Sequence, residues 1–316
     1  MNIVVAMLIG LSQALSSSVV LPCIQVVPGG AVESFWLQVK RGAEDAGDKH
    51  GYSIYFRGAK TSANINDQLR IVGIKEHLGC KALVLAPSTN YNEKTFLFDK
   101  DSIPVVFIDR NAGYSGSVSL VATDNYNAGY QAGIYMAKSL GGTGRIAVFR
   151  LKKGVSSTDL RESGFIHAAK ESGLEIIYDP YIGDNVADGR VAARGILARA
   201  SGELDGIFTP NETTSSSLLL ALEQSPPNKE MVNIGFDINQ RLLDGLENNV
   251  FTALVVQKPY KIGFIGVENA IDKINGKNTD AFIDTGHMII SRTNLNVQEV
   301  KKELLLNYPN LDIKGH

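Results

Sequence analysis

CIQVVPGGAVESFWLQVKRGAEDAGDKHGYSIYF, residues 23–56, contains an apolar run, a turn, an amphipathic stretch and a second apolar run. The apolar runs, CIQVV at 23–27 and SIYF at 53–56, have the length and composition of buried strands. Between them, one stripe at helical spacing is formed by Val32, Phe35, Trp36, Val39 and Ala43. The segment therefore predicts a strand–helix–strand unit with parallel strands.

The same alternation continues along the chain in two series. The first series adds ALVLA (82–86), PVVFID (104–109) and VSLVAT (118–123). The second comprises RIAVFR (145–150), EIIYD (175–179), GIFTP (206–210), VNIGFD (232–237) and FTALVVQ (251–257). These runs barely alternate with polar residues, which is typical of parallel strands buried on both faces. Because crossovers between parallel strands are right-handed and place helices on both faces, the predicted fold class is α/β, with two doubly wound parallel sheets.

Length and charge narrow the possible functions. A chain of 316 residues with 44% hydrophobic and 20% charged residues exceeds what one compact core usually fills, so we expect two domains. The 31 basic and 33 acidic residues give a formal net charge of -2, with no basic tail, which argues against nucleic acid as a partner. After the N-terminus, no segment approaches the roughly 20 apolar residues of a membrane helix.

The N-terminal segment has the features of an export signal. IVVAMLIGL at 3–11 is an apolar run of signal-peptide length, and small residues follow it at 12–16. We expect residues 1–22 to be a signal peptide, cleaved near Ala14 or Ser16, and the mature protein to be exported. A buried first strand would also look apolar, and no Lys or Arg precedes the run. Lipid attachment at Cys23 is the less favoured alternative, because Pro22 stands where a small residue is needed.

The two cysteines lie at the amino ends of neighbouring predicted strands. In the doubly wound order 2-1-3-4-5 the first and third strands are adjacent, and Cys23 and Cys80 begin or precede them. Adjacent strands lie about 4.8 Å apart, so a disulfide is sterically conceivable. The alternative is two small buried side chains that point to opposite faces of the sheet. The sequence leaves both open, and we favour the unbridged pair.

Polar residues follow the predicted strands, where open parallel sheets bind their ligands. Asp109 ends the fourth run of the first series and Arg110 follows it, while Asn211, Asp237 and Gln257 follow or end runs of the second. A sugar hydroxyl both donates and accepts, so its site needs carboxylates, Arg or Asn donors and an aromatic face. Each residue also has a structural alternative: an Asp-Arg pair is often a salt bridge, and an aromatic on a helix stripe is often core. Arg57 is more simply interpreted as a surface cation.

Seven segments occur in the order and spacing of a known family. They are ESFWLQVKRGAEDAG, IPVVFIDR, TDNYNAGYQAG, RESGF, NETTSSSLLLALE, GFD and VVQKPYKIGFIGVENA. Over residues 24 to about 295 the chain thereby resembles the periplasmic sugar-binding proteins of ABC transporters, the ribose- and galactose-binding group. The resemblance implies the type I periplasmic-binding-protein fold, two lobes joined by a three-stranded hinge. It also implies that the ligand is contacted by Glu33, Phe35, Trp36, Asp109, Arg110, Arg161, Asn211, Asp237 and Gln257.

The resemblance also implies a division of the chain. The N-terminal lobe would comprise residues 24–123 and 258–284, and the C-terminal lobe residues 124–257 and 285–316. The hinge would cross near residues 123–125, 257–259 and 284–285. Two departures separate this chain from ribose binders: Glu33 replaces an Asn, and the polar stretch 183–185 replaces an aromatic near the end of the seventh strand.

Other functions find little support. No Gly-rich dinucleotide fingerprint follows the first predicted strand, and the sequence has no phosphate loop and no GxSxG elbow. The five histidines, at positions 50, 77, 167, 287 and 316, are too far apart for metal-ligand spacing. We therefore predict no catalytic residues, no metal and no cofactor. The resemblance implies a periplasmic monomer that delivers a small sugar or polyol to an ABC transporter permease. The alternative is a periplasmic ligand-sensing partner of a membrane receptor or histidine kinase.

Overall fold

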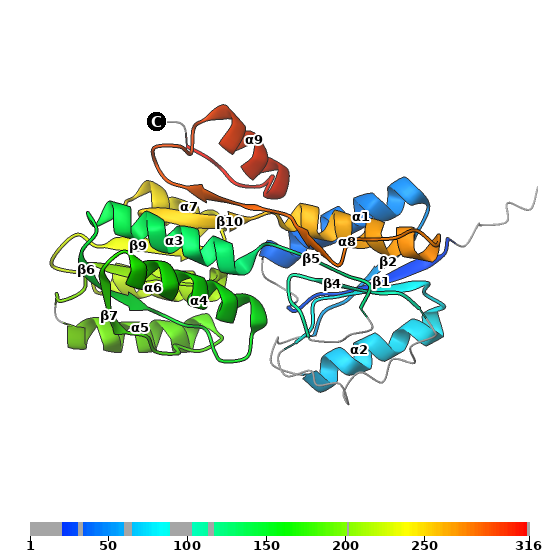
Figure 1. Cartoon of the computed structure of the whole chain (residues 1–316), viewed down its shortest axis with the longest axis horizontal. Helices are drawn as coiled ribbons and strands as arrows, with labels where there is room; N and C mark the ends of the chain where they lie inside the picture. Colours follow the sequence, from blue (N-terminus) through cyan, green and yellow to red (C-terminus); the bar gives the residue numbers. More distant parts are fainter. Residues whose placement is uncertain are drawn as a thin grey trace, which may run out of the picture.

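The structure of the protein is a computed structural model of the whole chain. The structure describes residues 21–30, 34–59, 65–88, 103–112, 117–200 and 202–314. Most of the predicted signal peptide, residues 1–20, therefore lies outside the described residues, as does Glu33. Within the described ranges the chain forms two α/β halves that lie end to end (Figure 1).

The first half is built on a sheet with the order β11-β5-β4-β3-β1-β2. All of its neighbouring strands pair in parallel. Its strands are β1 (Cys23–Val27), β2 (Ser53–Phe56), β3 (Ala82–Leu85), β4 (Val105–Ile108), β5 (Ser119–Ala122) and β11 (Phe282–Asp284). The expected order 2-1-3-4-5 is confirmed, and β11 extends the sheet beyond β5. The central strands β3 and β4 are buried along their whole length, as the uniform apolar runs predicted.

The second half repeats this arrangement with the order β12-β10-β9-β8-β6-β7. Its strands are β6 (Gly144–Val148), β7 (Leu174–Tyr178), β8 (Gly206–Phe208), β9 (Val232–Phe236), β10 (Ala253–Gln257) and β12 (His287–Ile290). Only β12 differs in direction, since it pairs antiparallel with β10. Position by position, β1, β3, β4 and β5 thus correspond to β6, β8, β9 and β10.

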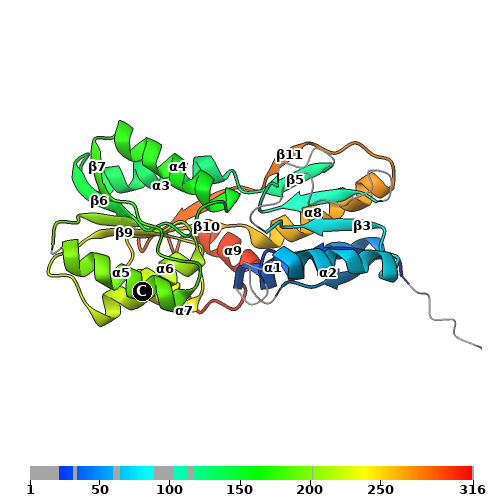
Figure 2. The same cartoon turned by 90° about the horizontal axis from the view of Figure 1, so that it is seen from below.

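Helices cover both faces of each sheet (Figure 2). They are α1 (Ser34–His50), α2 (Ile65–Leu78), α3 (Asn125–Ser139), α4 (Ser156–Glu171), α5 (Val186–Ala200), α6 (Glu212–Gln224), α7 (Gln240–Glu247), α8 (Pro259–Ile274) and α9 (Gln298–Asn307). The predicted stripe on α1 is buried at Phe35, Trp36, Val39 and Ala43, whereas Val32 lies outside the described residues. Among the described residues, no helix combines the length and apolar character needed to cross a bilayer.

Two helix pairs pack at glycine contacts in corresponding places. Helix α1 packs on α8, and α4 packs on α3. A Cβ at Gly42 or Gly263 would lie 2.0 Å from a carbonyl oxygen of the partner helix, and the same holds at Gly129 and Gly164. Only glycine permits backbones to approach this closely. The middle turns of α1 and α4 are therefore held against α8 and α3 in equivalent ways in the two halves.

The chain passes between the halves at three described places: from β5 to α3, from β10 to α8, and from β11 to β12 (Figure 1). One carboxylate ties two of these crossings together. Asp284 accepts the backbone N–H groups of Asp124, at 2.9 Å, and Gly286, at 2.8 Å. The crossings coincide with the segments that the family resemblance assigns to a hinge.

The two cysteines form a disulfide, so the favoured expectation of an unbridged pair was wrong. Their Cα atoms lie 4.5 Å apart. Cys80 precedes β3 and directly follows Gly79, which has a φ of 65°. Because Cys80 lies between a turn and the strand and not in the strand itself, the alternation of side chains along a strand does not fix its direction. The bridge also uses the thiol that lipid attachment at Cys23 would need.

A candidate ligand-binding cleft between the two halves

A cavity of about 60 Å³ lies between the carboxyl ends of the two sheets. Every predicted site residue that the structure describes contributes to its wall. The lining consists of Phe35, Trp36, Asp109, Arg110, Leu151, Ser157, Thr158, Arg161, Asn211, Glu212, Thr213, Asp237 and Gln257. Eight of these were predicted from the sequence, and the ninth predicted residue, Glu33, lies outside the described residues. The structure thus gathers side chains that are up to 222 positions apart, from Phe35 to Gln257.

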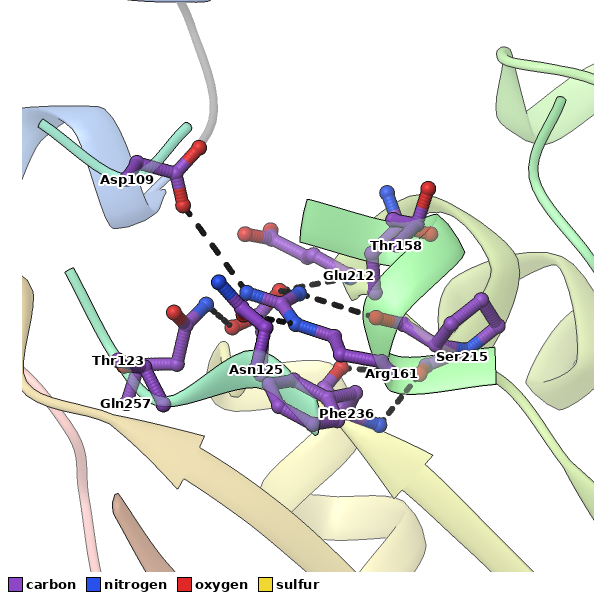
Figure 3. Close-up of polar contacts among 12 residues, drawn as sticks. Asp109, Thr123, Asn125, Thr158, Arg161, Glu212, Ser215, Phe236 and Gln257 are labelled. Atoms are coloured by element: carbon purple, nitrogen blue, oxygen red, sulfur yellow. Dashed lines mark hydrogen bonds and ion pairs between the residues drawn. The ribbon is translucent and has the colours of Figure 1, made fainter. Parts of the chain in front are cut away.

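Arg161 lies at the centre of the polar contacts (Figure 3). Its side chain is buried, and it donates through Nε to Asn125 Oδ1 at 2.7 Å and through Nη1 to the carbonyl of Pro210 at 3.0 Å. Its guanidinium lies 3.9 Å from Asp237 in its own half and 4.0 Å from Asp109 in the other half. Burial lowers the pKa of Arg161, and the two carboxylates oppose that shift.

The ring of Phe236 packs against the same guanidinium group. The Arg161 Cζ lies 3.9 Å from the centre of the Phe236 ring, which is the distance of a close cation–π contact. Gly129 of α3 packs directly against the Arg161 backbone carbonyl, so α3 also fixes the turn of α4 that carries this residue. The side chain is therefore held from three sides before any ligand contact is considered.

Asp237 directly follows β9 and has a left-handed backbone, with a φ of 67°. Its Oδ1 accepts from Gln257 Nε2 at 2.7 Å, and its Oδ2 accepts from the backbone N–H of Glu212 at 3.1 Å. Burial raises the pKa of Asp237, while Arg161 and these hydrogen bonds favour its charged form. The cost of the buried charge is thus partly offset by its polar neighbours.

Asp109 occupies the corresponding place in the first half. It directly follows β4, and its φ of 61° is also left-handed. It accepts from Arg110 Nε at 2.8 Å, and both side chains are largely buried. A non-glycine residue with positive φ is uncommon and tends to occur at functional sites. Here two aspartates at equivalent strand ends have this left-handed conformation, one on each side of the cavity.

Two aromatic rings supply an apolar wall. Phe35 and Trp36 meet edge to face with their centroids 4.9 Å apart, and both rings are almost fully buried. The Arg110 guanidinium lies 5.8 Å from the Trp36 ring centre. Trp36 therefore has both of the roles considered from the sequence. Its side chain packs in a hydrophobic core of the first half, and it also lines the cavity.

Two buried polar atoms in this cavity have no hydrogen-bond partner. They are Nη2 of Arg161, a donor, and Oε1 of Gln257, an acceptor. Burying a polar group without a partner costs free energy, so such atoms are rare unless something else satisfies them. A donor and an acceptor left open at one cavity match a ligand that can both accept and donate.

Sequence reasoning missed five lining residues: Leu151, Ser157, Thr158, Glu212 and Thr213. All of them lie in the second half, after β6 or at the starts of α4 and α6. The correspondence of the two halves was the signal that could have found Ser157 and Thr158, because they begin α4 as Phe35 and Trp36 begin α1.

Other polar candidates lie elsewhere. Arg57 is exposed and donates to Tyr55 at 3.3 Å, so it is a surface cation as expected. In the polar stretch 183–185, Asp184 forms an ion pair with Lys152 at 2.7 Å and is not among the lining residues. In the part of the chain that the structure describes, no cluster of three or more His, Cys, Asp or Glu residues has a metal-binding arrangement.

Comparison with known proteins identifies relatives along most of the chain. Residues 24–278 match the family model described as a periplasmic binding protein domain. The ribose import binding protein of Bacillus subtilis is 27% identical over 254 residues, which are 79% of this chain and 80% of that protein. Among solved structures, the periplasmic component of an ABC-type sugar transport system from Hahella chejuensis is 33% identical, with a TM-score of 0.78 over 86% of this chain and 100% of that one. An ABC transporter solute-binding protein from Agrobacterium vitis with bound D-fucose is 29% identical, with a TM-score of 0.81 over 88% and 98% of the two chains.

Proposed function

The chain belongs to the periplasmic binding protein family, and from this premise we propose that it captures a small sugar or polyol in the cavity between its two halves. The proposed setting is the periplasm, and the proposed partner is the permease of an ABC importer. Two observations on the relatives support this: one is named for ribose import, and another is an ABC transporter protein with bound D-fucose. These names favour transport over a sensing role.

The observation that carries the proposal is the chemistry of the cavity wall. It combines two buried carboxylates, two guanidinium groups, two amides and an aromatic pair. The two buried carboxylates are paired with cations of the protein, since Arg110 contacts Asp109 and Arg161 lies between Asp109 and Asp237. A neutral ligand with several hydroxyl groups suits such a wall. A hydroxyl group can accept from Arg161 Nη2 and donate to Gln257 Oε1, the two lining atoms that lack a hydrogen-bond partner in the protein.

We propose that binding closes the two halves as rigid lobes around the three crossings. The lobes would be those expected from the sequence, residues 24–123 with 258–284 and residues 124–257 with 285–316. A ligand shifts an open–closed equilibrium only through its stronger binding to one form. Asp109 and Arg110 on one side and Arg161 and Asp237 on the other would meet the ligand together only in the closed form. A permease could then distinguish loaded from empty protein by its shape.

A thermal-shift screen against sugars, polyols and amino acids tests the proposal. A ligand present at 100 times its Kd stabilises the folded protein by about 2.7 kcal/mol. For a protein of this size we expect at least one sugar or polyol to raise the melting temperature by several degrees. A screen in which amino acids stabilise the protein and sugars and polyols do not would contradict the proposed ligand class.

A further inference from the structure

Ser34 and Ser156 occupy corresponding places in the two halves. Ser34 is the first residue of α1, the helix that follows β1, and Ser156 is the first residue of α4, the helix that follows β6. The strands β1 and β6 hold the same position in their sheets, second from the edge formed by β2 or β7. Both serines therefore begin the helix that contributes a wall to the cavity.

Each serine hydroxyl donates a hydrogen bond to the opposite half. Ser34 Oγ donates to the carbonyl of Ile238 at 3.1 Å and lies 3.4 Å from a carboxylate oxygen of Glu212. Ser156 Oγ donates to the carbonyl of Asn111 at 3.1 Å. The two acceptors lie in the loops that follow corresponding strands, since Ile238 is the second residue after β9 and Asn111 is the third residue after β4. The molecule thus carries a similar contact twice, from the first residue of a helix in one half to the loop after a strand in the other half.

Donors and acceptors are both rigidly placed. The glycine contacts of α1 with α8 and of α4 with α3 fix the two helices that carry the donors. The acceptors come one and two residues after Asp237 and Asp109, the two left-handed residues that line the cavity. A movement that separates the two halves must therefore break both serine hydrogen bonds. As long as both bonds are intact, Asp109 and Asp237 stay at the wall of the cavity.

We propose that Ser34 and Ser156 are paired positioning residues that hold the two lobes closed through contacts between protein atoms alone. This proposal rests on the proposed function, since it concerns closure of the same cavity. The bonds involve no ligand atom, so they favour the closed form to the same extent with any ligand and without one. The apparent affinity of a closing protein depends on the fraction of molecules in the competent form, and this pair raises that fraction.

The variants are Ser34→Ala, Ser156→Ala and the double replacement. A neutral hydrogen bond contributes modestly, so loss of each one lowers the ratio of closed to open molecules by about 2- to 10-fold. Ser34→Thr and Ser156→Thr keep the hydroxyl group, and we expect them to keep the closed population. Ser163→Ala is the matched control, because Ser163 Oγ also donates to a carbonyl, that of Asp159 at 2.8 Å, but within α4.

The experiment measures the distance between spin labels by pulsed electron resonance. One label is attached at Asp48→Cys on α1 and the other at Lys170→Cys on α4, both exposed positions, while the native cysteines are bridged. Without ligand, we expect the double alanine variant to lose closed-form population relative to the wild type, and the threonine variants and Ser163→Ala to match the wild type.

Superimposed distance distributions for the wild type and the double alanine variant, at whatever distance they fall, overturn the proposal. Because no ligand is present, a failure to find a sugar in the thermal-shift screen would leave this result unaffected. Conversely, normal sugar binding with superimposed distributions would overturn the positioning role alone.

Discussion

Replacing Asp237 with Asn changes the charge at the cavity and little else. Asn has nearly the same size and is among the residues that tolerate a left-handed backbone, so the φ of 67° is retained. What is lost is the second carboxylate oxygen. In the wild type Oδ1 accepts from Gln257 and Oδ2 accepts from the backbone N–H of Glu212. In either orientation, the amide NH2 of Asn meets one of these donors.

The contacts set the size of the effect. A hydrogen bond to a charged group contributes about 1.5–3 kcal/mol. Asp237→Asn loses one of these bonds, and it also removes the negative charge 3.9 Å from Arg161. We expect both losses to turn the side chain of Gln257 or Arg161 away from the ligand. We expect the affinity for sugar to fall by about 2 kcal/mol or more, roughly 30-fold. Because burial raises the pKa of Asp237, removing its charge offsets part of the cost to folding.

Calorimetric titration with the sugar found by screening measures the affinity, and a melting curve checks the fold. Asp205→Asn is the control: Asp205 accepts the backbone N–H of Arg145 at 2.7 Å and pairs with Lys229 at 2.8 Å, but it lies outside the cavity. We expect this variant to bind as the wild type does. A folded Asp237→Asn protein with unchanged affinity, or equal losses in both variants, would refute the reasoning.

Three further outcomes follow from the structure. Arg110→Ala should weaken sugar binding by about 2 kcal/mol, since it removes the 2.8 Å donor to buried Asp109, and equal titration curves for variant and wild type would exclude Arg110 from the site. Reducing the Cys23–Cys80 bridge, which spans a sequence separation of 57, should lower the free energy of unfolding by about 4 kcal/mol in the chain-entropy model; coincident denaturant curves with and without reductant would contradict this. Burial lowers the pKa of His287 below 6.5, so the folded state binds fewer protons than the unfolded one, and stability rises with pH up to about 6.5 and is lost as the pH falls below it. His287→Gln should flatten this slope in unfolding curves recorded between pH 5 and 7, and an unaltered slope would assign it to other groups.

The strands were predictable because each is a short apolar run that ends in turn residues. All ten runs identified in the sequence form strands, and their order is the one expected for doubly wound sheets. The strands β11 and β12 were not predicted. Phe282–Asp284 has only three residues, and two of them are exposed, so no buried run marks it. Its pairing with β5 depends on contacts that are distant in sequence.

The site was predictable to the extent that its residues stand at strand ends. Asp109, Asp237 and Gln257 each end an apolar run, and the structure brings them to one cavity. Glu212 was missed because it stands one residue after Asn211, at the start of a helix, where an acidic residue has an ordinary capping role. The disulfide was misjudged because a side chain outside a strand has no strand alternation to reveal its direction.

A crystal structure of the protein with the sugar that stabilises it most would test the central claim most directly. We expect the sugar between the two lobes, with its ring beside Phe35 and Trp36 and its hydroxyl groups on Arg161 and Gln257. Hydrogen bonds from Asp109 or Arg110 on one side and from Asp237 on the other should be present together. A sugar bound outside this cavity, or one that contacts a single lobe, would contradict the account.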